Sequence, residues 1–340
     1  AYAEVEAREP WLTGSALTAD IGLLSAENFR NICPNALPEG IKQDLGANRI
    51  MLEGHYLYDI LDPEADFSKY RLLILPDTME IPEGELRDKL NAYLAGGGKL
   101  LLTGKSGTYE GKFVFDLGVD FGGEGQSRPA YLRPCFELAP NGQTSYVTYS
   151  RNYDIALRED FDGEVRDLKV ESYFNRAPRR FCSHQHTPYD RDKTSPAAVV
   201  TTQIGYIGWE IFTEYADKGS VHVKYAVLDI IDRLLGDGKT LATDLPSCGI
   251  TSVAVKATEN GTQLIHQLVY AIPKVRGGGI EIIEDLPFTP DVTCSLAVPA
   301  APKRVYLAPA MTDLPFTYED GRVTYTVPGF SCSAMVVVEM

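Results

Sequence analysis

The sequence lacks the features that mark membrane proteins and nucleic-acid-binding proteins. No apolar run approaches the roughly 18 residues of a membrane-spanning helix, and no stretch of the sequence is recognised as a signal peptide. Basic residues are in deficit, with 32 Lys and Arg against 47 Asp and Glu, so the formal net charge is −15. To bind a nucleic acid, a chain with this negative net charge would need a local basic patch, and none is evident. We expect neither a membrane partner nor a nucleic-acid partner.

The cysteines lack the paired C-x-x-C spacing of metal and redox motifs. The six are scattered: Cys33, Cys135, Cys182, Cys248, Cys294 and Cys332. Most stand in apolar or strand-like surroundings, so we interpret them as reduced, buried thiols of a cytoplasmic protein. An exported or periplasmic protein with one or two disulfides stays open, because six is even and Asn260-Gly-Thr262 forms a glycosylation sequon.

Two short apolar runs, at residues 72–75 and 100–102, predict buried parallel strands, because each is closed by a turn signal. Between them, apolar residues recur at steps of three and four from Ile81 to Leu94, which predicts an amphipathic helix. A strand, helix and strand in this order cross over right-handed into a parallel sheet. The sequence therefore predicts an α/β domain.

The remaining pattern predicts three regions. Residues 1–12 are expected to be the end of a preceding helix and a linker, and residues 13–237 the α/β domain with an irregular insertion at about 109–195. Within that domain, residues 17–24 and 58–61 are predicted strands, and a hairpin at 197–210 and an amphipathic helix at 221–235 close the domain. From residue 238 to residue 340, eight short segments of period two, among them 304–308 and 322–327, are separated by glycine, proline and Asp-Gly turns, which is typical of an antiparallel β-sandwich.

This order of segments resembles the C-terminal half of glycoside hydrolase family 42 β-galactosidases and related glycosidases. The resemblance is carried by Arg8-Glu-Pro-Trp11, by residues 63–76 and 95–107, and by the tail at 334–339, and it spans nearly the whole chain. It implies a trimerisation domain of class I glutamine-amidotransferase-like, flavodoxin-like fold, followed by a small β-domain. In that family a (β/α)8 barrel carries the two catalytic glutamates, and this chain is expected to begin in the last barrel helix.

The resemblance implies that this chain is a non-catalytic assembly or scaffold portion of a β-galactosidase-like enzyme of carbohydrate metabolism. The expected partners are the N-terminal barrel of the parent protein, further copies of the chain in a homo-oligomer such as a trimer, and a carbohydrate substrate that the parent enzyme binds. No cofactor is expected. Two alternatives stay open: a stand-alone carbohydrate-binding or interaction module, and a small-molecule hydrolase on an amidotransferase-like fold.

The hydrolase alternative depends on the turn after residues 100–102. An amidotransferase carries a nucleophilic cysteine on that turn, with small neighbours and a histidine base. Lys105 and Ser106 occupy it here, so the turn is interpreted as degenerate and no catalytic residue is assigned. Ser106 would act as a nucleophile only if a histidine lay within hydrogen-bond reach.

Cys182-Ser-His-Gln-His186 is a second candidate site. If this segment is extended, Cys182, His184 and His186 project from one face of a strand, and these residue types bind zinc. The alternatives are a carbohydrate or intersubunit contact and a structural, hydrogen-bonded loop. No metal is assigned, because no second half-site has a recognisable spacing. Trp209, near the end of a predicted strand, is the preferred anchor of an interface.

Overall fold

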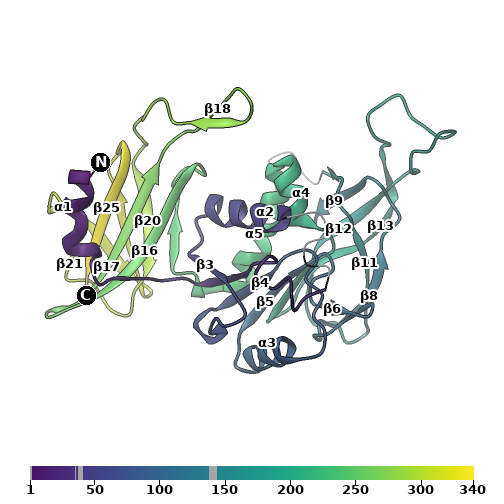
Figure 1. The fold of residues 1–340 in the computed structure, drawn as a ribbon, viewed down its shortest axis with the longest axis horizontal. Coiled ribbons are helices and arrows are strands. Elements are labelled where there is room, and N and C mark those ends of the chain that lie inside the picture. Colours follow the sequence, from purple (N-terminus) through teal and green to yellow (C-terminus); the bar gives the residue numbers. More distant parts are fainter. Residues whose placement is uncertain (1, 35, 37–40, 138–143) are drawn as a thin grey trace. The chain divides into compact units, whose positions relative to one another are not determined.

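The computed structural model describes residues 2–34, 36, 41–137 and 144–340 (Figure 1). The chain divides into two compact units. The sandwich unit consists of residues 1–20, 51–58 and 237–340, and the mixed-sheet unit consists of residues 21–50 and 59–236. Residues 13–20 and 51–58, which the sequence analysis assigned to the α/β domain, therefore belong to the sandwich unit.

Helices are few compared with strands. The described part of the chain forms α1 (Tyr2–Leu12), α2 (Lys42–Glu53), α3 (Glu85–Ala95), α4 (Ile211–Lys218) and α5 (Val221–Leu235), with 3-10 turns η1 (Phe67–Lys69) and η2 (Gly236–Gly238). The predicted helix at 221–235 is confirmed to the residue. Helix α4 was not predicted, because its eight residues are too few to show a helical period.

The mixed-sheet unit is built around one nine-stranded sheet. In spatial order the strands are β10 (Tyr146–Thr148), β9 (Ala130–Pro134), β12 (Glu164–Ser172), β13 (Tyr189–Val200), β14 (Ile204–Ile207), β5 (Lys99–Thr103), β4 (Leu72–Leu75), β2 (Ile21–Leu24) and β3 (Tyr58–Leu61). The neighbours from β14 to β2 pair in parallel, whereas those from β10 to β14 pair antiparallel. Two further two-stranded antiparallel sheets are present: β8 (Val119–Glu124) pairs with β11 (Tyr153–Leu157), and the hairpin strands β6 (Thr108–Tyr109) and β7 (Lys112–Phe113) pair with each other.

The predicted fold class is wrong for this unit. A flavodoxin-like domain is a parallel sheet covered by helices, but strands make up 41% of this chain against 19% for helices, and half of the large sheet is antiparallel. The reason lies in the segment at 109–195, which was interpreted as an irregular insertion. It supplies β9, β10, β12 and most of β13, and register shifts in the pairing of β12 with β13 obscure the alternation of period two.

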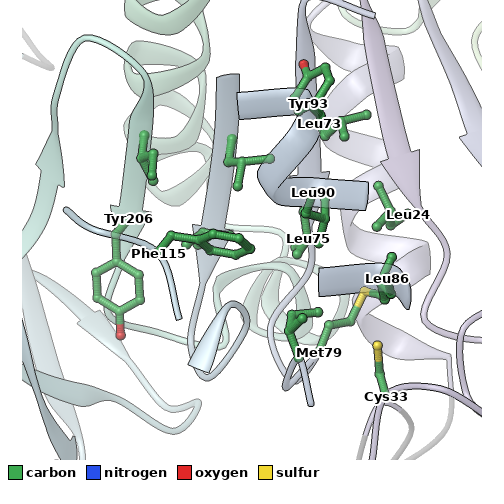
Figure 2. Close-up of a cluster of buried hydrophobic side chains, with 14 of the residues drawn as sticks. Leu24, Cys33, Leu73, Leu75, Met79, Leu86, Leu90, Tyr93, Phe115 and Tyr206 are labelled. Atoms are coloured by element: carbon green, nitrogen blue, oxygen red, sulfur yellow. The ribbon is translucent and has the colours of Figure 1, made fainter. Parts of the chain in front are cut away.

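Helix α3 covers one face of the parallel strands. Leu86, Leu90 and Tyr93 of α3 pack on Leu73 and Leu75 of β4 in a single buried cluster (Figure 2). Burial of a leucine side chain stabilises by roughly 1.5–3 kcal/mol, so this cluster is a main source of stability for the unit. The predicted strands at 72–75 and 100–102 and the predicted helix between them are confirmed.

Helices α2, α4 and α5 cover the opposite face. Ile204 and Tyr206 of β14 point into the cluster beneath α3, so Gly205 between them faces the other way, where a Cβ atom would meet Ile230 and Leu234 of α5. Helix α2 crosses α4 at Gly46, where a Cβ atom would lie only 1.9 Å from the carbonyl oxygen of Phe212. Glycine is therefore required at this crossing.

The sandwich unit consists of two antiparallel sheets. The first is β1 (Ala16–Leu17), β16 (Gly249–Thr258), β17 (Gly261–Tyr270), β25 (Cys332–Glu339), β21 (Arg304–Ala308) and β22 (Thr312–Asp313). The second is β15 (Leu241–Thr243), β20 (Val292–Ala297), β24 (Arg322–Val327) and β23 (Phe316–Glu319). The predicted β-sandwich is confirmed, and the expected strands at 304–308 and 322–327 match to the residue.

The sandwich has a core on each side of its larger sheet. Val253, Leu268 and Val336 of that sheet pack against Leu296 and Tyr325 of the smaller one. The outer face of the larger sheet is covered in part by α1, from which Trp11 and Leu12 pack against a separate small cluster. The predicted first strand at 17–24 is thus divided, since β1 joins this unit while β2 joins the mixed sheet.

Candidate functional site

The turn after β5 holds Ser106 in a structural role. Ser106 is fully buried, and its hydroxyl oxygen accepts a hydrogen bond from the backbone N–H of Thr103 at 2.7 Å. The backbone N–H of Ser106 donates to the carbonyl oxygens of Asp77 and Thr103. Gly104 and Gly107 take positive φ angles of 58° and 69°, which let the chain reverse tightly. The hydroxyl therefore closes the turn and does not face a space where a substrate could bind.

Lys105 points elsewhere. Its Nζ lies 3.6 Å from Oε1 of Glu80, and its side chain is 36% exposed, so the pair is a partly exposed ion pair. Such a pair contributes at most about 1 kcal/mol. Neither residue of the predicted turn is therefore placed as an active nucleophile or base.

Histidine contacts lie away from this turn. His222 stacks on Tyr146 with ring centroids 3.9 Å apart, and His186 bonds to Tyr149. His266 lies in the sandwich unit, where both ring nitrogens contact hydroxyl groups. The structure therefore gives no support to an amidotransferase-like mechanism.

Asp77 is the residue that organises the ends of the parallel strands, and sequence reasoning missed it. It stands two residues after the end of β4 and is fully buried at a positive φ of 34°. Its carboxylate accepts from the Thr103 hydroxyl at 2.9 Å, from the Phe212 N–H at 3.2 Å, and from the N–H and hydroxyl of Thr213, both at 2.7 Å. Phe212 and Thr213 open α4, so an acidic group meets the positive end of that helix.

Burial dominates the electrostatics of Asp77. Desolvation raises the pKa of its carboxyl group to about 7, although the hydrogen bonds from Thr213 and Thr103 act in the opposite direction. The carboxyl group is occupied by these hydrogen bonds, so its role at this position is structural. The pattern Pro76-Asp77 after a buried strand was the available signal for it.

Asp167 is a second buried carboxyl, on β12. Both of its oxygens are enclosed without a hydrogen-bond partner among the described residues. Burial raises its pKa to about 8, and the negative charge of Asp229 raises it further, against the opposing effect of Arg166. Arg166 is itself held by Asp229, with Nε to Oδ2 at 2.8 Å and Nη2 to Oδ1 at 2.9 Å. Asp167 is therefore kept neutral beside a complete ion pair.

The segment with Cys182, His184 and His186 is not a strand. It forms bends between β12 and β13, so the three side chains do not share one strand face as the zinc interpretation required. The Cys182 thiol lies 3.5 Å from the carbonyl oxygen of His184, and Nδ1 of His186 lies 3.1 Å from the Tyr149 hydroxyl. Among the described residues, no three His, Cys, Asp or Glu side chains are grouped as metal ligands.

Trp209 lies inside the chain. Its side chain is 0% exposed, and its indole N–H has no hydrogen-bond partner among the residues that the structure describes. The expectation of an interface anchor needs an accessible ring, which this position does not offer. The position after β14 explains this burial, because α4 begins two residues later and covers it.

All six cysteines are free thiols. Burial is confirmed for Cys33 and Cys294, where desolvation raises the pKa to about 12 and about 11, respectively. Cys135, Cys248 and Cys332 are exposed, so the expectation of buried thiols is wrong for these three. No helix in the described part of the chain combines the length and apolar character needed to cross a membrane.

Comparison with known proteins addresses the resemblance directly. Residues 49–135 match the family described as the β-galactosidase trimerisation domain. The predicted resemblance is confirmed. The match covers α3 and the parallel strands β4 and β5, which are the elements that carried the prediction. The β-rich content of the unit shows that the trimerisation domain is not the flavodoxin-like domain that the resemblance implied.

Solved structures extend the likeness to the whole chain. An α-L-fucosidase isoenzyme 2 from Paenibacillus thiaminolyticus is 40% identical with a TM-score of 0.92, over 99% of this chain and 51% of that one. A β-galactosidase from Bacillus circulans sp. alkalophilus is 12% identical with a TM-score of 0.60, over 99% of this chain and 44% of that one. A β-galactosidase from Rahnella sp. R3 is 13% identical with a TM-score of 0.57, over 98% and 43%.

These relatives differ in what they support. At 12% and 13% identity the two β-galactosidases show a shared fold alone, whereas the fucosidase is similar in sequence along nearly the whole chain. The chain spans about half the length of these relatives. No curated protein matches the chain.

Proposed function

We propose that this chain is the non-catalytic assembly portion of a glycoside hydrolase. The match of residues 49–135 to the β-galactosidase trimerisation domain is the observation that carries the proposal. The family resemblance implies two partners for such a portion: further copies of itself and a catalytic (β/α)8 barrel. A trimer is the oligomer that the family description names.

The strand-end turn supports a non-catalytic role. Ser106 is buried and closes the turn through Thr103, and the carboxyl group of Asp77 is occupied by the first residues of α4. Both polar groups therefore serve the fold at this position. The catalytic carboxylates of the parent enzyme belong on the barrel.

For the parent enzyme we assign an α-L-fucoside as the substrate class. The relative that is 40% identical over 99% of this chain is named an α-L-fucosidase, whereas the likeness to β-galactosidases is confined to the fold. The assignment replaces the β-galactoside that the sequence resemblance suggested.

The experiment compares the intact gene product with the 340-residue chain. Both are measured by light scattering coupled to size exclusion, and both are assayed with p-nitrophenyl α-L-fucoside and p-nitrophenyl β-D-galactoside. We expect the isolated chain to assemble without hydrolysing either compound, and the intact product to hydrolyse the fucoside. Hydrolysis by the isolated chain, or a single-chain mass at about 100 μM, would contradict the assembly role. Turnover of the galactoside alone would overturn only the substrate.

The loop with Cys182, His184 and His186 fits a contact role within this function. His184 is exposed and His186 is half-buried against Tyr149, whose ring also lies 5.0 Å from Nζ of Lys218. These groups suit a polar ligand or a partner surface. We expect the double substitution His184→Ala and His186→Ala to leave folding intact while changing assembly or turnover of the intact enzyme. If stability, assembly and turnover all stay unchanged, the loop has no such role.

A further inference from the structure

The loop between β12 and β13 is basic, whereas the chain as a whole is acidic. Residues 173–188, here called the basic loop, contain Arg176, Arg179 and Arg180 and no Asp or Glu, so their formal charge is +3. The whole chain carries −15, which leaves −18 on the other residues. Figure 1 shows this segment projecting beyond the ends of β12 and β13. The loop therefore presents a charge opposite to that of the rest of the chain.

The charges of the basic loop are not neutralised within the chain. Its three arginines are exposed, and none of them pairs with a carboxylate among the described residues. Arg176 donates to the carbonyl oxygen of Gln185, and the guanidinium of Arg180 lies 4.7 Å from the ring centroid of Phe174. Phe181 beside them is 73% exposed. Arginine and exposed aromatic rings are the residues enriched at the centres of protein interfaces.

A pocket lies at the opposite end of the same two strands. Its volume is about 430 Å³, and it is lined by residues just before β12, just after β13, from α3 and from the segment before β8. We call it the acidic pocket. Leu117 and Ile204 are 2% and 4% exposed and form an apolar floor. Such a floor can accept an aromatic side chain.

Carboxylates stand around this floor. The side chains of Asp116 and Asp160 are 78% and 70% exposed, and both pair with Arg158. Asp162 is exposed as well, and no described residue pairs with it. The residues that line the pocket therefore carry a formal charge of −2. Opposite charges across an interface speed association and fix the register of the two surfaces.

The geometry directs the basic loop to the pocket of another copy. Strand β12 runs from Glu164 at the pocket to Ser172 at the loop, and its nine residues span roughly 25 Å. Glu164 pairs with Val200 and Ser172 with Tyr189, so β13 separates the two surfaces by the same distance. A loop that meets a pocket on the next copy makes a head-to-tail contact, which closes into a ring if the rotation between copies fits. A ring of three agrees with the trimer that the matched family description names.

We propose that the basic loop of one copy docks in the acidic pocket of a second copy of this chain. Phe181 then covers the apolar floor, and Arg179 and Arg180 meet Asp160 and Asp162. The inference rests on the assembly role proposed above and names the two surfaces that carry it. Both surfaces lie in the mixed-sheet unit, and each copy supplies one of each, so every loop has a pocket to fill.

The test reverses the charges on each side of the contact and then on both sides. The loop variant is Arg179→Glu with Arg180→Glu, the pocket variant is Asp160→Lys with Asp162→Lys, and the combined variant carries all four changes. Like charges then face each other in the loop variant and in the pocket variant. We expect the dissociation constant between copies, measured by sedimentation, to rise roughly 100-fold or more in each. The combined variant restores attraction and the native net charge, so its constant should return to within about tenfold of the native value.

The control for net charge is Arg30→Glu with Lys69→Glu. Both residues are exposed in the mixed-sheet unit, and their reversal changes the net charge as much as the loop variant does. We expect this control to keep the oligomer of the native chain. Circular dichroism and thermal unfolding confirm that each variant is folded.

A cross-linking measurement locates the contact. A photo-reactive amino acid at position 181, in a mixture of isotopically light and heavy chains, is expected to link one copy to residues 114–118 of another. Links formed only within one chain would overturn the inference, since the loop would then pack on its own polypeptide.

The remaining outcomes separate this inference from the assembly role. A native oligomer in the loop variant would overturn the inference and leave the assembly role intact. A combined variant that is folded but does not assemble would show that the acidic pocket is not the acceptor, which overturns it as well. If the basic loop instead retains the chain on heparin while the loop variant keeps the native oligomer, the loop binds an anionic polysaccharide and the inference is wrong. A native chain that is monomeric would refute the assembly role, and the inference with it.

Discussion

Nδ1 of His266 lies 2.7 Å from the hydroxyl oxygen of Tyr325 in the core of the sandwich. On the other side of the ring, Nε2 lies 2.6 Å from the Thr251 hydroxyl, which itself donates to the carbonyl oxygen of Gln267. The Thr251 oxygen therefore accepts from Nε2–H, and Nδ1 accepts from Tyr325. The imidazole is neutral and fully satisfied, and burial together with the charge of His55 lowers its pKa to about 3.

The sandwich should lose stability in acid because of His266. In the unfolded chain the imidazole has a pKa of about 6.5, so unfolding takes up a proton at any pH between 6.5 and 3. This contribution is fully present above pH 6.5 and falls by up to about 1.4 kcal/mol per pH unit as the pH drops towards 3. Urea unfolding at a series of pH values measures it. The variant His266→Gln should show a shallower loss over this window, and an unchanged slope would contradict the assignment.

The variant Tyr325→Phe tests the hydrogen bond itself. It removes the hydroxyl that donates to Nδ1 of His266 and leaves a buried acceptor without a partner. Such a loss costs about 1–3 kcal/mol of unfolding free energy at neutral pH. The matched control is Tyr318→Phe, because Tyr318 is 36% exposed and should change the free energy by less than about 0.5 kcal/mol.

Asp77 should show the opposite pH dependence. Its pKa is raised to about 7 in the folded chain from 3.8, so its stabilising effect is complete below pH 3.8 and is lost as the pH rises through 7. The variant Asp77→Asn cannot ionise, but it loses acceptors for the start of α4. Its deficit in unfolding free energy is therefore expected to be largest below pH 4 and to shrink towards pH 7. A deficit that does not vary with pH would show that folding does not raise the pKa of Asp77.

Asp167→Asn is the matched variant for this measurement. Its pKa is also raised, to about 8, but its oxygens accept no hydrogen bond among the described residues. We expect the same pH trend without the large deficit at low pH.

Ser106→Ala distinguishes a structural hydroxyl from a nucleophile. The substitution leaves the buried N–H of Thr103 without its acceptor, so the unfolding free energy should fall by about 1–3 kcal/mol. The kcat/KM of the intact enzyme should stay unchanged at temperatures where the variant is folded. Loss of turnover in a variant of native stability would mean that Ser106 takes part in chemistry.

Gly46→Ala should disrupt the crossing of α2 and α4. The new Cβ atom would lie 1.9 Å from the carbonyl oxygen of Phe212, so the two helices must separate. Overpacking of this kind costs about 1–3 kcal/mol or more, which thermal unfolding detects as a lower Tm. Gly277→Ala is the control, because no atom lies within 4 Å of the Cβ position there. Equal effects of the two substitutions would refute the close approach.

The elements predicted best are those whose pattern is local. The strands at 58–61, 304–308 and 322–327 and the helix at 221–235 match the structure to the residue, because a run of four to fifteen residues shows its own hydrophobic period. The strand at 17–24 was predicted as one element, but the chain changes units within it. Period alone does not show which sheet a strand joins.

The candidate site was predictable only in part. The family resemblance and the position of the degenerate turn at Lys105 and Ser106 came from the sequence, and the comparisons confirm the resemblance. The sequence did not predict the burial of Trp209 or the bends in the segment from Cys182 to His186. Both features depend on the residues that pack around them. Hydrophobic periodicity shows which face of a helix or strand is buried, but it does not show which residues pack against that face.

By itself, the sequence determined the helices and strands with strong periods, the sandwich at the C-terminal end, and the kinship with glycoside hydrolases. The tertiary structure decided the sheet order, the antiparallel half of the large sheet and the role of each polar group at the strand ends. Asp77 and Thr213 are 136 residues apart in the chain, yet their hydrogen bonds fix the start of α4. Contacts of that separation form only when distant segments pack together, so no local pattern in the sequence contains them.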